Sequence, residues 1–557
     1  MVGSGAALAS LTTDAGGTTA INGGTVRTTG AQAYNDAVTL GVATTLTSTG
    51  GGAITLGSAV DGGGALTVNT TGATTFIGAV GATTALASLT TNAGGSTAIN
   101  GGAVTTTGAQ SYNDAVTLGA TTILTSSATG NIAFATTLDG AQALTVNTSG
   151  ITSFGGAVGG TTALTSLTTN AGGSTAINGG AVTTTGAQSY NDAVTLGANA
   201  ILTSTGSGNI AFATTLDGAQ ALTANTAGTT SFGGAVGAGT ALASLTTNAG
   251  GSTAINGGAV NTTGAQSYND AVTLGATTIL TSSATGNIAF ATTLDGAQAL
   301  TANTAGTTSF GGAVGAGTAL ASLTTNAGGS TAINGGAINT TGAQSYNDAV
   351  TLGATTVLTS TATGNIAFAT TLDGARSLTV NTAGITSFGG AVGGTDALVS
   401  LTTDGAGSTA INGGAITTTG AQSYNDAVTL GAGTTLTSTG SGAITLGSTV
   451  NGAQALAVNT AGITTFLGTV GAGTALASLT TDAAGTTDLN GGTVITSGAQ
   501  TYNDAVVLSA DTTLSAGGNI GFATTVDSDT TARALTVNTS AATTFGGWSA
   551  AARLWLR

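Results

Sequence analysis

The chain has 557 residues, of which 95 are Gly, and it contains no Pro, Cys, His, Lys or Glu. Twenty Asp and five Arg give a formal net charge of -15 at pH 7. Without His, Cys, Lys or Glu the chain cannot form a Ser-His-Asp triad, a thiol nucleophile, a Schiff-base lysine, a phosphate-loop lysine or a zinc finger. The composition therefore favours a protein that is not an enzyme, with no catalytic residue, metal site or organic cofactor.

The same composition limits the partners that the chain can bind. Nucleic acid needs clustered Lys and Arg to neutralise its phosphates, whereas here five Arg stand against twenty Asp. The apolar residues are scattered among Thr, Gly and Ser, so no run of 18 or more could span a bilayer. We expect no nucleic-acid partner and no membrane insertion.

The N-terminal residues already belong to a repeat. Residues 7–11, Ala-Leu-Ala-Ser-Leu, are identical to residues 241–245. No positively charged segment followed by an apolar stretch precedes them, so no signal peptide is predicted in this chain. We expect a chain that starts in mid-repeat, as a fragment of a longer protein would.

A repeat of 78 residues extends along the chain. The segment Gly-Ala-Gln-Ser-Tyr-Asn-Asp-Ala-Val-Thr-Leu recurs with its tyrosine at Tyr34, Tyr112, Tyr190, Tyr268, Tyr346, Tyr424 and Tyr502. Phenylalanine keeps the same interval in one series of Phe76, Phe154, Phe232, Phe310, Phe388 and Phe466 and another of Phe134, Phe212, Phe290 and Phe368. We expect the tyrosines to lie against a face or a corner, stacked every fourth coil.

A shorter period of about twenty residues divides each repeat. A Leu-Thr or Val-Thr pair recurs at intervals of 20, 20, 18 and 20 residues, beginning at Leu124, Leu144, Leu164, Val182 and Leu202. In this alignment Phe134 and Phe154 share one column. Another column holds Leu138, Val158, Ile177 and Leu196. Each repeat is therefore predicted to contain four coils.

The fold predicted from these columns is an all-β parallel β-helix, or β-solenoid, with about 20 residues per coil and four coils per repeat. Abundant Gly, Thr and Val disfavour helix, and stretches such as Ile-Ala-Phe-Ala-Thr alternate with period two. Asn-Gly-Gly and Asp-Gly-Ala mark the corners. Residues 1–547 form one β-helix of seven repeats in this interpretation, and residues 548–557, which hold both Trp, form a tail outside the repeat.

The run from Leu167 to Leu196 resembles the repeats of large bacterial surface proteins of the filamentous haemagglutinin type. The resemblance covers residues 1 to about 547. It implies a right-handed parallel β-helix that is secreted or held at the bacterial cell surface, and many proteins of this type are adhesins. It also implies a partner that is a carbohydrate or a host or cell surface. Because no polar cap is recognised at either end, we also expect the coils to associate end to end.

The aspartates form two main series. Asn-Asp-Ala-Val contributes Asp36, Asp114, Asp192, Asp270, Asp348, Asp426 and Asp504. Leu-Asp-Gly contributes Asp139, Asp217, Asp295 and Asp373. We interpret both series as turn-capping or solvating residues rather than calcium ligands or catalytic acids, because an acid repeated along a rod makes a single tuned site improbable.

Function is predicted from length and repetition. The leading hypothesis is a structural or adhesive rod whose many weak sites add through avidity. The alternatives are a polysaccharide-acting β-helix, an ice-binding protein built on rows of Thr, and a non-functional gene fragment. A β-helix enzyme would need one region that departs from the repeat with a cluster of charge.

Overall fold

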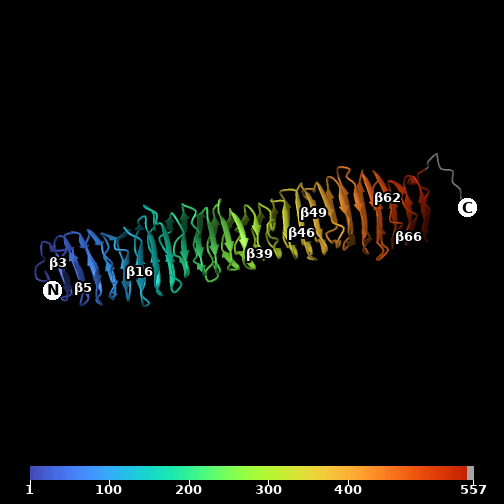
Figure 1. The fold of residues 1–557 in the computed structure, drawn as a ribbon. Helices are drawn as coiled ribbons and strands as arrows, with labels where there is room; N and C mark the ends of the chain where they lie inside the picture. Colours follow the sequence, from blue (N-terminus) through green and yellow to red (C-terminus); the bar gives the residue numbers. More distant parts are fainter. Residues whose placement is uncertain (548–557) are drawn as a thin grey trace. The chain divides into compact units, whose positions relative to one another are not determined.

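The computed structural model describes residues 1–547, and within that range every regular element is a β-strand. The chain is divided into two units, Met1–Ser283 and Ala284–Arg557, of which the structure describes residues 1–283 and 284–547. In each unit the strands of successive coils run side by side in parallel (Figure 1). The predicted class of fold, an all-β parallel β-solenoid, is confirmed.

Each repeat supplies ten strands, from β1 (Leu11–Thr13) to β70 (Thr543–Phe545) in the described chain. The second repeat shows the pattern. Its strands are β14 (Gln110–Tyr112), β15 (Ala115–Leu118), β16 (Thr122–Ser126), β17 (Ile132–Phe134), β18 (Leu138–Asp139), β19 (Ala143–Asn147), β20 (Ile151–Phe154), β21 (Ser166–Thr169), β22 (Ser174–Ile177) and β23 (Ala181–Thr184).

Three consecutive strands make one coil, because each strand pairs with the third strand after it. β14 pairs with β17, β15 with β18, and β16 with β19, all in parallel. Inward-facing residues alternate with outward-facing ones along each strand, as in the burial of Ile132 and Phe134 on either side of the part-exposed Ala133. The three faces of the coil therefore enclose one narrow apolar core.

The pattern changes once in every repeat, where isolated bridges take the place of a strand. Val158 bridges Leu138 of β18 to Val182 of β23, and Leu164 bridges to Thr184, without either belonging to a strand. In unit 2, Val392 bridges Leu372 to Ile416 in the same way. One repeat thus fills eleven sheet positions, ten strands and one position held by isolated bridges, at three positions per coil.

A repeat of 78 residues therefore spans three coils and two-thirds of a fourth, rather than the four coils predicted. Tyr112 and Tyr190 are 78 residues apart and lie in different sheets, on β14 and β24 (Gln188–Tyr190). Starting at Gln32 and moving each time to the paired residue in the next coil, one reaches Tyr268, in the third repeat after that of Gln32, in eleven moves. The residues reached are Ile54, Thr74, Thr97, Val116, Leu138, Val158, Val182, Leu202, Ala224, Thr247 and Tyr268. Equivalent residues of successive repeats therefore lie on successive faces of the coil, and they return to the same face after three repeats.

The coil is about 22 residues long, slightly longer than the predicted 20. Phe134 does stack below Phe154, and Val182 pairs with Leu202, as the columns predicted. Leu124, however, pairs with Val146 and not with Leu144. The predicted column of Leu138, Val158, Ile177 and Leu196 is also wrong in part, since Ile177 and Leu196 continue the column of Phe154.

The tyrosines lie inside the core, which corrects the prediction that they lie against a face or a corner. Tyr190 is fully buried, and its ring stacks on Phe212 with centroids 5.2 Å apart. Phe212 stacks in turn on Phe232 at 5.7 Å. Stacking therefore occurs between adjacent coils rather than every fourth coil, and it adds to the apolar area that the rings bury.

Candidate functional site

The main polar feature of each repeat is a buried aspartate at the corner between two strands. In the third repeat, Asp192 lies between β24 and β25 (Ala193–Leu196) and is 4% exposed. Its Oδ1 accepts hydrogen bonds from the hydroxyls of Thr169, at 2.9 Å, and Thr175, at 2.8 Å. Both threonines belong to the preceding coil, so the carboxyl ties one corner to the strands on either side of the corner below.

We call this arrangement the clamp and its carboxyl the clamp aspartate. It occurs in every repeat with hydroxyl-to-carboxyl distances of 2.7 to 3.0 Å. The clamp aspartates are Asp36, Asp114, Asp192, Asp270, Asp348, Asp426 and Asp504. Their prediction as turn-capping or solvating residues is corrected: they are buried and accept bonds from side chains.

The second carboxyl oxygen of the clamp distinguishes the repeats. Oδ2 is buried without a hydrogen-bond partner in Asp114, Asp192, Asp270 and Asp348. In the other three copies Oδ2 accepts a further bond from a clamp threonine, for example from Thr409 to Asp426 at 2.9 Å. The clamp thus satisfies one carboxyl oxygen everywhere and the other only in part.

Burial dominates the titration of most clamp aspartates. Desolvation raises the pKa of Asp192, Asp270 and Asp348 above the ordinary value for Asp, against the opposing effect of the threonine hydrogen bonds. Desolvation likewise raises the pKa of Asp426 and of Asp504.

Asp36 differs from these five aspartates. Its hydrogen bond from Thr13 outweighs desolvation and lowers its pKa. Thr13 belongs to the first strand, and its side chain is part-exposed.

The second aspartate series caps turns, as predicted. Oδ1 of Asp217 accepts hydrogen bonds from the backbone N–H groups of Gly239, at 2.8 Å, and Thr240, at 3.0 Å. Asp139, Asp295 and Asp373 bind the corresponding loops in the same way. In the sixth repeat Asn451 makes both bonds, so the turn needs an oxygen acceptor and not a charge.

A buried glutamine joins the aromatic column to the backbone. The Tyr190 hydroxyl donates to Gln188 Oε1 at 3.0 Å. Gln188 Nε2 donates to the carbonyls of Val182, at 3.2 Å, and Thr203, at 3.0 Å. Sequence reasoning missed this network, although Gln and Tyr stand two residues apart and so share the inward face of one strand.

The outward faces are nearly uncharged and carry small side chains. One outward column runs through Thr145, Thr168, Ser189, Ala211 and Ser231 in neighbouring coils. Thr is interrupted there by Ser and Ala, so the column is no continuous row of threonines. Larger apolar side chains are exposed at several repeated positions, one of which holds Ile123, Ile201, Ile279 and Val357 and another Ile151, Ile385 and Ile463.

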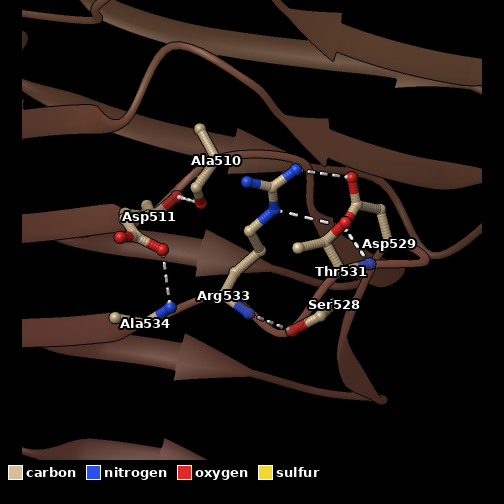
Figure 2. A network of polar contacts seen from close by, with 8 residues as sticks. Ala510, Asp511, Ser528, Asp529, Thr531, Arg533 and Ala534 are labelled. Atoms are coloured by element: carbon tan, nitrogen blue, oxygen red, sulfur yellow. Dashed lines mark hydrogen bonds and ion pairs between the residues drawn. The ribbon is translucent and has the colours of Figure 1, made fainter.

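In one region the sequence departs from the repeat and charged residues lie close together. Near the C-terminal end of unit 2, Arg533 donates from Nε and Nη2 to the two carboxyl oxygens of Asp529, at 3.1 and 3.0 Å (Figure 2). The backbone N–H of Ala534 donates to Asp511. Arg533 lowers the pKa of Asp529, so this carboxyl is held ionised. The cluster therefore holds the loop of residues 528–534 together and ties it to Asp511 in the preceding coil.

The described residues form no cluster of metal ligands and no membrane-spanning helix. Within residues 1–547 no group of three or more His, Cys, Asp or Glu could hold a metal ion. That part of the chain also has no helix with the length and apolar character that a membrane span requires. Hollows of about 290 Å³ beside Phe545 and about 230 Å³ beside Met1 contain no acidic residue.

Comparison with known proteins adds no family. No protein-family model, no curated protein and no solved structure matches the chain. The resemblance to repeats of the filamentous haemagglutinin type stays a prediction, and the chain is described by its fold, a parallel β-solenoid of stacked repeats.

Proposed function

We propose that the chain is the structural rod of a bacterial surface or secreted protein, which holds a carbohydrate or a cell surface by many weak contacts. The observation that carries this proposal is the turn of one face between successive repeats. Tyr112 and Tyr190 are equivalent residues on different faces. Every surface feature that recurs once per repeat is therefore presented in three directions, which favours multivalent contact from any side.

The chemistry of the faces supports weak rather than tight binding. Outward positions are mostly Thr, Ser, Ala and Asn, which offer hydroxyl and amide groups without charge. Exposed apolar side chains are spaced 78 residues apart, for example Ile123 and Ile201. Such sites bury little area individually, so their effect depends on the number that engage at once.

Two alternatives receive less support. An ice-binding face needs a regular flat array of Thr on one side of the rod, whereas the column from Thr145 to Ser231 includes Ala211 and the repeat changes face. A polysaccharide-acting β-helix needs two acids in one cleft. The repeated acids here are either buried in clamps or bound to turns, as Asp192 and Asp217 illustrate.

The experiment is a binding assay with the full chain in two forms. Beads that carry many copies are offered to a panel of immobilised glycans and to cells, and soluble chain is added as a competitor. Multivalent binding predicts that beads adhere and that soluble chain competes weakly. Replacing Ile123, Ile201, Ile279 and Val357 by Thr, which stands at this position in the first, sixth and seventh repeats, should weaken adhesion in proportion to the number replaced. Adhesion that is abolished by a single replacement would point to one unique site instead.

A further inference from the structure

The clamp aspartates have no cation to balance them. The chain contains no Lys and no His, and among residues 1–547 the one ion pair joins Arg533 to Asp529, outside the clamps. Asp192 and Asp270 receive only hydroxyl groups on Oδ1. An ionised carboxylate taken out of water without a counter-charge is unfavourable, and two neutral hydrogen bonds offset only part of that cost.

The carboxyl oxygen without a hydrogen-bond partner indicates which ligand the clamp binds. Oδ2 of Asp192, Asp270 and Asp348 is buried and accepts no hydrogen bond. Half of the charge of an ionised carboxylate would rest on this atom, in a region of low dielectric constant. A bound proton removes that charge and leaves Oδ1 free to accept the same two threonine bonds.

The ionisable groups around each clamp act in the same direction. The nearest one to Asp192 on its own strand is Tyr190, whose hydroxyl is turned to Gln188 and whose pKa burial raises far above its ordinary value. Strands β21 and β22, which are packed against the clamp, supply no charged group. In the sixth and seventh repeats the carboxylates of Asp404 and Asp482 lie near the clamp and raise the pKa further.

We propose that three clamp aspartates are proton-binding sites that are occupied in the folded chain, so that the solenoid is stabilised by acid and loosened as these protons leave. They are Asp192, Asp270 and Asp348, whose buried Oδ2 has no hydrogen-bond partner. Burial raises the pKa of each, whereas Asp36 keeps a lowered pKa and lies outside the set.

The direction of the pH dependence follows from linkage. A carboxyl whose pKa is higher in the folded state takes up a proton on folding. Its contribution to stability is fully present below the ordinary Asp pKa of about 3.9, and it is lost as pH rises through the folded-state pKa. Within that window each site changes the unfolding equilibrium constant by about tenfold per pH unit. Acid therefore stabilises these clamps, the reverse of ordinary acid denaturation.

The test compares two sets of three Asp→Asn substitutions in the full chain. The first set replaces Asp192, Asp270 and Asp348, because Asn mimics a neutral carboxyl. The matched control replaces the turn-capping Asp217, Asp295 and Asp373, where Asn preserves the bonds as Asn451 does. Both variants lose the same number of ionisable carboxyls. Thermal unfolding midpoints are measured by circular dichroism from about pH 4 to about pH 8.

The proposal predicts that the unfolding midpoint of the unmodified chain falls as pH rises, and that the control keeps this slope. The clamp variant should lose most of the slope and be more stable than the unmodified chain at the alkaline end. A control that loses the slope while the clamp variant keeps it would overturn the proposal, because relief of net charge would then explain the effect.

Infrared spectroscopy of the unmodified chain decides the question if the clamp variant does not fold. The band of protonated carboxylic acids should persist above the pH at which exposed Asp ionise, with an intensity of about three of the twenty carboxyls. Disappearance of the band in one step near the ordinary Asp pKa would overturn the proposal.

Discussion

Substituting Tyr190 by Phe isolates a single buried hydrogen bond. The ring of Tyr190 keeps its stacking on Phe212, at 5.2 Å, because Phe has the same shape. The hydroxyl that donates to Gln188 Oε1 at 3.0 Å is lost. Gln188 is fully buried and its Nε2 is fixed by the carbonyls of Val182 and Thr203, so its Oε1 cannot turn to water.

The magnitude follows from that geometry. Leaving a buried acceptor unsatisfied costs about 1–3 kcal/mol. Since about 1.4 kcal/mol corresponds to a tenfold change in an equilibrium constant, local opening should become about 5- to 150-fold more frequent. The effect should be confined to the strands around β24, because a solenoid is stabilised by contacts between neighbouring coils.

Hydrogen exchange read by mass spectrometry is the appropriate assay. A repeat array need not unfold in two states, so a global midpoint would dilute a local change. The altered peptide differs in mass from its otherwise identical copies around Tyr268 and Tyr346, which serve as internal controls. Unchanged exchange around residue 190 would refute the reasoning, because it would mean that the hydroxyl contributes nothing to the core.

Four other positions around Tyr190, three in the third repeat and one at the end of the second, test neighbouring features by the same local exchange measurement. Phe212→Leu should cost only about 1 kcal/mol, since Leu stands there in the first and sixth repeats, whereas Phe212→Ala should cost about 3–5 kcal/mol through the cavity it leaves. Asp217→Asn should change local stability by no more than about 0.5 kcal/mol, and Asp217→Ala should loosen the capped loop by about 1 kcal/mol, because two backbone N–H groups lose their acceptor. Gly218→Ala should destabilise by at least about 1–3 kcal/mol, because φ is +127° and an added Cβ would collide with the carbonyl oxygen of Leu196. Thr175→Val removes one of the two donors of a clamp whose carboxyl has a raised pKa, so the resulting loss of stability should be greater at neutral than at acidic pH, and an equal loss at both would contradict this sign.

The sequence predicted the class of fold, because columns of apolar residues at fixed spacing leave few alternatives to stacked coils. It did not predict the register. Pairing Leu124 with Leu144 or with Val146 keeps the same residues pointing inward, since a shift of two residues preserves the alternation of a strand. Only the length of each corner separates these two registers, and corner lengths were not recognised in the pattern.

The clamp and the glutamine network were missed for a different reason. Asp and Gln are usually exposed, so the residue type alone places Asp192 and Gln188 on the surface. Their burial depends on partners supplied by other strands: Thr169 and Thr175 for Asp192. In every repeat the two threonines precede the aspartate by 23 and 17 residues. Only when the coil length is known does this spacing show that the three residues lie at the same corner in adjacent coils. The turn-capping role of Asp217 was predicted from residue type at an Asp-Gly corner, but the turn that it caps, at Gly239 and Thr240, lies in the next coil and could not be identified without the coil length.

The central claim is that paired residues of adjacent coils are about 22 residues apart in the sequence, as at β16 and β19. Engineered disulfides test this claim most directly. The chain has no Cys, so two introduced ones report a single pair. Thr125 and Asn147 are partners on neighbouring strands, whereas Thr145 pairs with Ile123. Disulfides form only when the two Cα atoms are about 4.4–6.8 Å apart. The account predicts rapid oxidation of Thr125→Cys with Asn147→Cys and slow oxidation of Thr125→Cys with Thr145→Cys; the opposite order would contradict the register and the turn of one face per repeat.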